Sequence, residues 1–91
     1  MDAQSTADKV REVMFVDDAA SRMLGMQVVE IGPGHAVLTM TVRVDMLNGF
    51  AVCHGGLIAT LADSAFAFAC NSRNALTVAS GFDIDILRSA K

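Results

Sequence analysis

The sequence contains no tryptophan, no tyrosine and a single proline in 91 residues, and ten acidic side chains outnumber seven lysines and arginines. A chain with a net charge of -3 and no basic cluster has no electrostatic basis for binding nucleic acid or an anionic membrane surface. Two cysteines, Cys53 and Cys70, are too few for a disulfide scaffold and have no zinc-binding spacing, so no metal site is expected. The longest apolar run, residues 57–70, contains Asp63 and is shorter than the roughly 20 residues that span a bilayer.

These absences predict a cytoplasmic protein with reduced cysteines, because residues 1–4 are polar and do not begin a secretory signal. The length allows one domain, residues 1–91. Hydrophobic residues make up 53% of the chain. That share is high for a small monomer, since a chain of this size buries only about 60% of its surface on folding. The surplus of apolar surface predicts a partner subunit.

Periodicity and turn residues predict an α+β domain with the order helix, strand, strand, helix, strand. The first 25 residues are helical, with Asp17 or Asp18 capping a second short turn and Gly25 ending it. Strands over residues 26–31 and 36–44 are separated by a Gly-Pro-Gly turn, and Val44 is placed on the packed face. Residues 57–71 form a helix that is apolar on nearly every side and is therefore buried, with Phe66, Phe68 and Cys70 in the core. Residues 77–87 alternate again and predict a third strand, which gives a thin sheet with exposed edges.

Two glycines, Gly55 and Gly56, lie at the start of this apolar helix and leave its first N–H groups uncovered. The positive end of a helix stabilises an anion or the charge that develops on a carbonyl oxygen. The alternative, which spacing alone favours, is that the glycines only permit a tight turn. His54 is expected to hydrogen-bond the backbone or contact a substrate. A nucleophilic pair with Cys53 is disfavoured, because adjacent side chains in an extended loop point apart.

Asp63 is a charged residue in an apolar helix and needs an explanation. Burial would make it a stronger general base, whereas a hydrogen bond from Thr60 or from a loop N–H would make it structural, and the sequence leaves both open. Asp63 follows the glycines by seven or eight residues, which is about 10–12 Å along a helix. Carbonyl polarisation and water attack occur at one carbon, within about 3–3.5 Å of each group. A joint function therefore predicts two subunits with antiparallel helices side by side.

The motifs Leu47-Asn48-Gly49, His54-Gly55-Gly56 and Leu61-Ala62-Asp63, followed by Ala-Phe-Ala at 65–67 and Ala-Cys-Asn-Ser at 69–72, resemble the hotdog-fold acyl-CoA thioesterases. The phenylacetate-degradation (PaaI-type) branch is the most similar, over about residues 23–88. The resemblance implies a hotdog fold, in which a curved antiparallel sheet surrounds a long helix, and a homodimer or homotetramer. It further implies hydrolysis of aryl or phenylacetyl-type acyl-CoA thioesters at the dimer interface, with no metal or organic cofactor.

The resemblance also implies roles for individual residues. Gly55 donates its N–H to the thioester oxygen with help from Asn48, and Asp63 of the neighbouring subunit activates water or attacks directly. His54 positions the loop or contacts the thioester, and Gly56 is expected to contact the substrate. Apart from the resemblance, Ser80 is expected to contact the substrate because Ser80 and Thr77 could face the site across the sheet. Family members continue with further strands after a Leu-Arg-Pro segment, whereas this sequence has Ser89 in place of the proline and stops, so an incomplete chain is expected.

A catalytically silent subunit that binds acyl thioesters or a partner is the alternative function. A dehydratase or isomerase of the same fold is disfavoured, because it needs a histidine facing the acyl chain and His54 is the only candidate.

Overall fold

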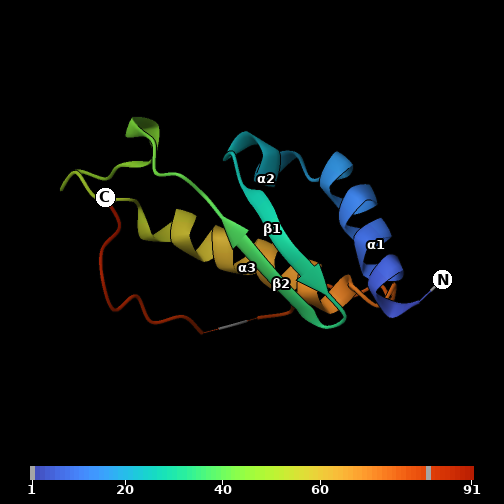
Figure 1. Ribbon diagram of the computed structural model, residues 1–91. Helices are drawn as coiled ribbons and strands as arrows, with labels where there is room; N and C mark the ends of the chain where they lie inside the picture. The colour runs from blue at the N-terminus through green and yellow to red at the C-terminus, as the bar shows by residue number, and fades with distance from the viewer. Residues whose placement is uncertain (1, 82) are drawn as a thin grey trace.

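The computed structural model describes residues 2–81 and 83–91. Its elements are α1 (Ala3–Asp17), α2 (Ala19–Met23), β1 (Gln27–Gly32), β2 (His35–Thr39), the 3₁₀ turn η1 (Val44–Met46) and α3 (Gly55–Asn71). The β1–β2 hairpin packs across the long helix α3, and α1 lies over one end of both (Figure 1). The long helix packed against an antiparallel sheet is the arrangement that the sequence predicts as far as residue 71. Within the described ranges, no helix combines the length and hydrophobicity that a membrane span requires.

Of the residues that cap the two N-terminal helices, the sequence predicts Asp18 and Gly25 but not Asp2. The Asp2 side chain caps α1 by accepting the Ser5 N–H at 2.7 Å, and this hydrogen bond lowers the pKa of Asp2. Asp18 caps α2 by accepting the Ser21 N–H at 3.1 Å. Gly25 follows with φ +70°, the left-handed conformation in which helices commonly stop. The predicted break between the two helices is therefore confirmed.

The hairpin contains a β-bulge that the alternating pattern does not reveal. β1 pairs antiparallel with β2, and the register shifts between Val28 and Glu30. Because the bulge adds one residue to β1, Val28 and Ile31 both face the core although they are three positions apart. The second strand ends at Thr39 instead of residue 44. Val44 was placed on the packed face, but it lies in η1 and is 87% exposed.

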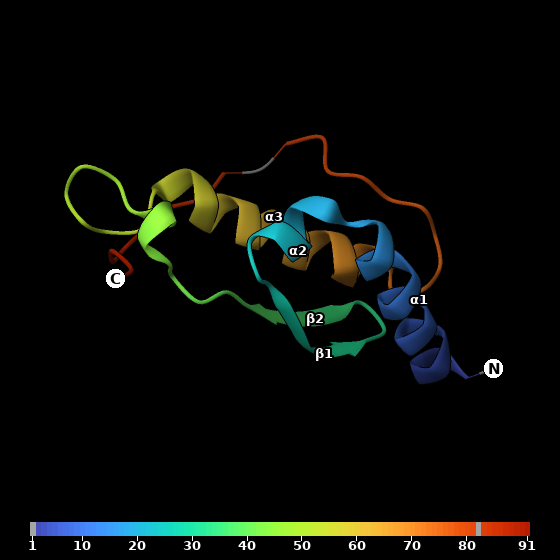
Figure 2. The same ribbon diagram turned by 90° about the horizontal axis from the view of Figure 1, so that it is seen from above.

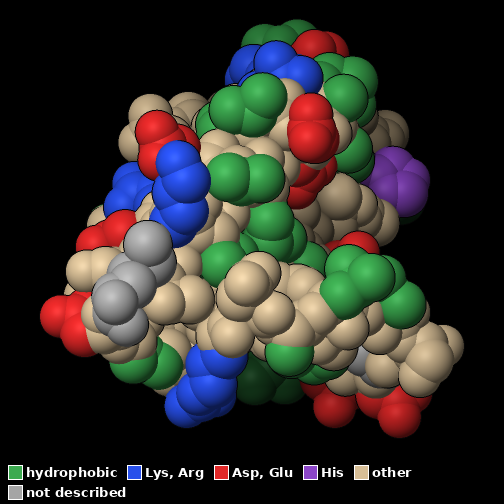
Figure 3. Space-filling model, turned by 90° about the vertical axis from the view of Figure 1, so that its right-hand side faces the viewer, with side chains coloured by type: hydrophobic (Ala, Val, Ile, Leu, Met, Phe, Trp, Pro, Cys, Tyr) green, Lys and Arg blue, Asp and Glu red, His purple; other side chains and the backbone are tan. Residues whose placement is uncertain are grey.

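Two side chains of α1 donate hydrogen bonds to backbone carbonyls on the outer edge of β1. The Gln4 amide donates to the Ile31 carbonyl at 2.7 Å, and the Arg11 guanidinium donates to the Val28 carbonyl. These bonds take the place of a neighbouring strand along this edge. On the end of the molecule that carries α1, apolar side chains lie exposed between charged ones (Figure 3). Val13 and Val16 of α1 are more than half exposed.

The core has one cluster toward each end of α3. Toward the C-terminal end, Phe68 is fully buried with Ala7, Val28 and Ile31, and its ring centroid lies 6.4 Å from that of Phe15. Toward the N-terminal end, the buried side chains belong to Leu24, Met26, Met46 and Cys53. Two strands cover only one side of α3, so the predicted burial of the whole helix is wrong. Phe68 is in the core as expected, whereas Phe66 is 47% exposed and Cys70 is half-buried.

After α3 the chain turns back and runs along the helix toward its start, with α3 lying between this segment and the hairpin (Figure 2). Near its end the segment is held by a hydrogen bond from the Cys53 N–H to the Ala90 carbonyl at 2.7 Å. The third strand predicted over residues 77–87 is not formed in the described part of that range. A strand requires a hydrogen-bonded neighbour, and β2 lies on the other side of α3, so the described residues of this range have no strand to pair with.

Candidate functional site

At the start of α3, the backbone N–H of Gly55 has no acceptor among the described residues. His54 is the N-cap: its Nδ1 accepts the Gly56 N–H at 3.2 Å, and its carbonyl oxygen accepts the Leu57 N–H at 2.9 Å. The predicted hydrogen bond between His54 and the backbone is therefore confirmed. No described residue accepts the N–H of Gly55. This donor lies at the positive end of a 17-residue helix, where the helix dipole favours negative charge.

Both glycines at this helix start have close neighbours. A Cβ on Gly55 would lie 3.2 Å from Cδ1 of Ile86, which comes from the segment that runs back along α3. A Cβ on Gly56 would lie 3.4 Å from Nδ1 of His54. The glycines therefore bring the backbone of the first turn close to its surroundings, and Ile86 is a neighbour of the site that the sequence analysis did not identify.

Asn48 lies in a tight loop directly before His54. An isolated β-bridge between Leu47 and Cys53 closes the loop, and the Asn48 N–H donates to the Val52 carbonyl at 2.8 Å. The Asn48 Oδ1 accepts the Phe50 N–H at 2.8 Å and lies 3.4 Å from the Val52 nitrogen. Because these backbone donors fix the oxygen toward the loop, the amide NH₂ is the group that remains to donate. Asn48 is therefore held as a donor close in sequence to Gly55.

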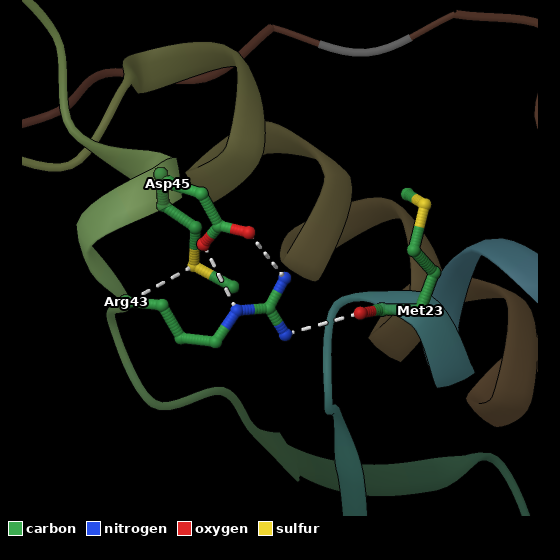
Figure 4. A network of polar contacts seen from close by, with 4 residues as sticks. Met23, Arg43 and Asp45 are labelled. Carbon is green, nitrogen blue, oxygen red and sulfur yellow. Dashed lines mark hydrogen bonds and ion pairs between the residues drawn. The ribbon is translucent and has the colours of Figure 1, made fainter.

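The segment that leads into this loop is fixed at both ends. Arg43 donates to both carboxylate oxygens of Asp45, at 3.0 and 3.3 Å, and to the carbonyl of Met23 at 3.1 Å (Figure 4). The Arg43 hydrogen bond lowers the pKa of Asp45. Farther along, the His54 N–H donates to the carbonyl of Met46, whose side chain is buried. These contacts connect the end of α2 to the loop that carries Asn48.

Asp63 lies on an exposed part of α3, eight residues after Gly55. Thr60 does not hold it, because the Thr60 hydroxyl donates to the Gly56 carbonyl at 2.9 Å. The Asp63 side chain lines a hollow of about 230 Å³ between α3 and the segment that runs back along it. The other lining residues are Ala62, Phe66, Ala79, Gly81, Asp83 and Ile84. The sequence analysis missed Asp83, because periodicity alone does not show which residues of this segment contact α3.

The structure brings some of the predicted residues together and keeps others apart. Asn48, His54, Gly55 and Gly56 lie at one end of α3. Since α3 is continuous from Gly55 to Asn71, Asp63 is about 12 Å along the axis from Gly55 in the same chain. Ser80 is exposed and lies in sequence between two residues that line the hollow, but it does not line the hollow itself. In the part of the chain that the structure describes, no group of three or more His, Cys, Asp or Glu side chains could hold a metal ion.

Comparisons with known proteins show which proteins this chain is similar to. No family model matches the chain. It is 49% identical over 75 residues to the acyl-coenzyme A thioesterase PaaI of Escherichia coli, an alignment that covers 82% of this chain and 54% of that protein. It is 36% identical over 83 residues to an Archaeoglobus fulgidus protein provisionally assigned as an esterase, covering 91% of this chain and 54% of the relative. The chain therefore spans about half the length of the curated relatives that it matches.

A solved structure shows the same relationship. The E. coli PaaI protein from the phenylacetic acid degradation operon superposes with a TM-score of 0.95 at 43% identity, covering 98% of this chain and 64% of that one. The path of the backbone is thus shared over nearly all of the present residues. The predicted resemblance is confirmed: the chain is homologous to the PaaI acyl-CoA thioesterase and has the corresponding part of its hotdog fold.

Proposed function

We propose that this chain hydrolyses acyl-CoA thioesters at a composite site, formed by Gly55 and Asn48 of one protomer and Asp63 of a second. The observation that carries the proposal is the unused Gly55 N–H at the start of α3, with an exposed carboxylate about 12 Å farther along the same helix. The identity to a protein named as an acyl-CoA thioesterase supports the reaction type. The operon named for E. coli PaaI favours aryl acyl groups such as phenylacetyl.

In this proposal the thioester carbonyl oxygen accepts hydrogen bonds from the Gly55 N–H and from the Asn48 NH₂. Both donors are in place before substrate binds, because His54 caps the helix and the Asn48 oxygen is fixed to its own loop. The dipole of α3 adds to their effect. These groups stabilise the negative charge that develops when the carbonyl carbon becomes tetrahedral.

Asp63 of the second protomer is proposed to supply the nucleophile, either by activating a water molecule or by attacking directly. Its carboxylate removes a proton from a water molecule, and the water oxygen bonds to the carbonyl carbon. Collapse of the tetrahedral intermediate breaks the carbon–sulfur bond and releases the free acid and the coenzyme A thiolate, which takes up a proton. Alternatively, the carboxylate bonds directly to the carbonyl carbon, the carbon–sulfur bond breaks to release the coenzyme A thiolate, which takes up a proton, and water then hydrolyses the mixed anhydride to the free acid and the original carboxylate. Both routes consume one water and give the same products.

The geometry of a single chain supports the two-protomer arrangement in this proposal. The reacting carbon must lie within about 3–3.5 Å of both groups, and a rigid helix separates Gly55 from Asp63 by more than that. Antiparallel α3 helices of a homodimer or homotetramer would bring the two groups together twice per pair. His54 and Gly56 are proposed to contact the substrate beside the two donors, and Ser80, which does not line the hollow next to Asp63, is proposed to contact it outside that hollow. A cytoplasmic location fits the unpaired cysteines Cys53 and Cys70.

Replacement of the carboxylate tests this function. Asp63→Asn keeps the shape of the side chain and removes the base, so turnover of phenylacetyl-CoA, followed with a thiol-trapping reagent, is expected to fall about 10²–10⁴-fold. Asp83→Asn is the matched control, because Asp83 lines the same hollow and has no assigned role. Undiminished turnover in a folded Asp63→Asn protein would contradict the proposal. A folded wild-type protein that hydrolyses no aryl or acyl thioester would instead support the silent binding subunit.

A further inference from the structure

The last residue of α3, Asn71, is largely buried and uses its whole side-chain amide. Its Nδ2 donates to the carbonyls of Ala67 and Thr77, each at 2.8 Å. Its Oδ1 accepts the Thr77 N–H, also at 2.8 Å. One side chain thus pairs with both backbone polar groups of Thr77. This is the pattern by which an antiparallel strand fixes its neighbour.

The helix end that carries Asn71 is itself held in place. The adjacent Ser72 is fully buried, and its hydroxyl accepts the Gly34 N–H at 2.6 Å and donates to the Ala69 carbonyl at 2.7 Å. These bonds connect the end of α3 to the turn of the β1–β2 hairpin. Asn71 therefore holds Thr77 from a fixed position in the fold.

Thr77 begins the segment that passes Asp63. Ala79 and Gly81 line the hollow with Asp63, whereas the intervening Val78 and Ser80 do not. Farther along, Asp83 and Ile84 both line it, so the alternation holds only as far as Gly81. Successive side chains of an extended segment point to opposite sides, so a shift of one residue would exchange the two sets.

We propose that Asn71 is a positioning residue that sets the register of residues 77–81 and 83–84 against α3. Its bonds to Thr77 place the small residues Ala79 and Gly81 beside Asp63. They keep Val78 and Ser80 away from it. The space next to the carboxylate is thereby left for the acyl group of the substrate. The inference rests on the proposed function only in taking Asp63 as part of the active site.

Disulfide trapping measures the register directly, without any enzymatic activity. In a background with Cys53→Ser and Cys70→Ser, the pair Ala62→Cys and Ala79→Cys is expected to cross-link several-fold faster than the pair Ala62→Cys and Ser80→Cys. Ala62 and Ala79 line the same hollow, whereas Ser80 does not. Adding Asn71→Ala should abolish this preference. An unchanged preference would overturn the proposal.

A second variant covers the case in which Asn71→Ala does not fold. Asn71→Asp keeps the acceptor for the Thr77 N–H and loses both donors, and protonation of the new carboxyl restores one of them. The ratio of the two cross-linking rates is therefore expected to fall at neutral pH and to recover as the pH decreases. Asn74→Asp, an exposed replacement in the same turn, is the matched control. A ratio in Asn71→Asp that equals the control at every pH would refute the assignment.

The kinetic readout separates this inference from the proposed function. If the wild-type protein hydrolyses phenylacetyl-CoA, Asn71→Asp should raise KM more than it lowers kcat, because the carboxylate and the oxyanion donors are unchanged. If no thioester is hydrolysed while the cross-linking preference depends on Asn71, the register assignment stands and the proposed function fails.

Discussion

Gly55→Pro removes the backbone N–H that is proposed to donate to the thioester oxygen, and it should leave the helix around it undisturbed. Gly55 is the first residue of α3, a position at which proline is favoured. His54 has φ -58° and ψ 129°, which lies in the region that a residue before proline adopts. Among the described residues, nothing accepts the Gly55 N–H, so no hydrogen bond within the chain is lost. Gly55→Ala is the matched control, because both variants place a Cβ about 3.2 Å from Ile86 Cδ1 and only proline lacks the N–H.

The expected size of the effect follows from the role of that hydrogen. Loss of one oxyanion donor lowers kcat by about 10²–10³-fold. Gly55→Ala, which retains the donor, should remain within a few-fold of the wild-type protein, since Ile86 lies on an irregular segment and can shift by a few tenths of an ångström. Steady-state hydrolysis of phenylacetyl-CoA by both variants, with circular dichroism to verify α3, measures the difference.

Mixing two inactive variants then tests whether two protomers share the site. A dimer of Gly55→Pro with Asp63→Asn contains one site with both groups intact and one with both defective. Random assembly from equal amounts of the two chains should therefore restore about a quarter of the wild-type turnover, given two equivalent sites per symmetric dimer. The two chains are expressed together with different tags, and the hybrid, once purified on both, should have about half of the wild-type turnover because one of its two sites is intact.

Two results would refute this reasoning. A purified hybrid no more active than either parent would mean that the groups do not meet across an interface. An equal loss in Gly55→Ala and Gly55→Pro would show that crowding against Ile86, and not the N–H, controls turnover.

Other consequences of the structure are open to direct measurement. Asn48→Asp keeps the oxygen that holds the loop but removes the NH₂ donor, so kcat should fall about 10²-fold with an unchanged circular dichroism spectrum, and an unaltered kcat would remove Asn48 from the site. Phe68→Ala should lower the free energy of unfolding by about 3–5 kcal/mol in urea titrations, because Phe68 is the largest of the fully buried side chains in the described part of the chain. Gly34→Ala should reduce the melting temperature, since Gly34 has φ +75° and a Cβ there would lie 2.5 Å from the Arg73 guanidinium. Asp45→Asn should be less stable than wild type at neutral pH, and the difference should vanish in acid: the Arg43 hydrogen bond lowers the folded-state pKa, so its contribution is present above the unfolded value of about 3.9 and is lost as the pH falls through the folded one. A difference that persists in strong acid would argue against that pair.

Local chemistry made much of the fold predictable. Asp18 as a helix cap, Gly25 as a helix stop and His54 as a hydrogen-bonding residue before α3 each depend on neighbours within a few positions. The long helix and the hairpin followed from hydrophobic period and from the Gly-Pro-Gly turn. The axial distance between Gly55 and Asp63 was also predictable, because it depends only on the number of helical residues between them.

Features that depend on distant contacts were not predictable. The bulge that turns both Val28 and Ile31 inward arises from pairing with β2. The exposure of Phe66 reflects how much of α3 the rest of the chain covers, which its own composition does not reveal. Which residues after Asn71 face Asp63 depends on a hydrogen bond to Thr77 that alternation alone cannot locate.

The two edges of the hairpin differ in whether their backbone carbonyls already accept hydrogen bonds from side chains. Gln4 and Arg11 occupy backbone carbonyls along β1, so a strand arriving there would first have to displace two side chains of α1. Along β2, no described residue does the same. A strand that extends this sheet would therefore add more easily at β2 than at β1, where it would compete with the N-terminal helix for the backbone carbonyls.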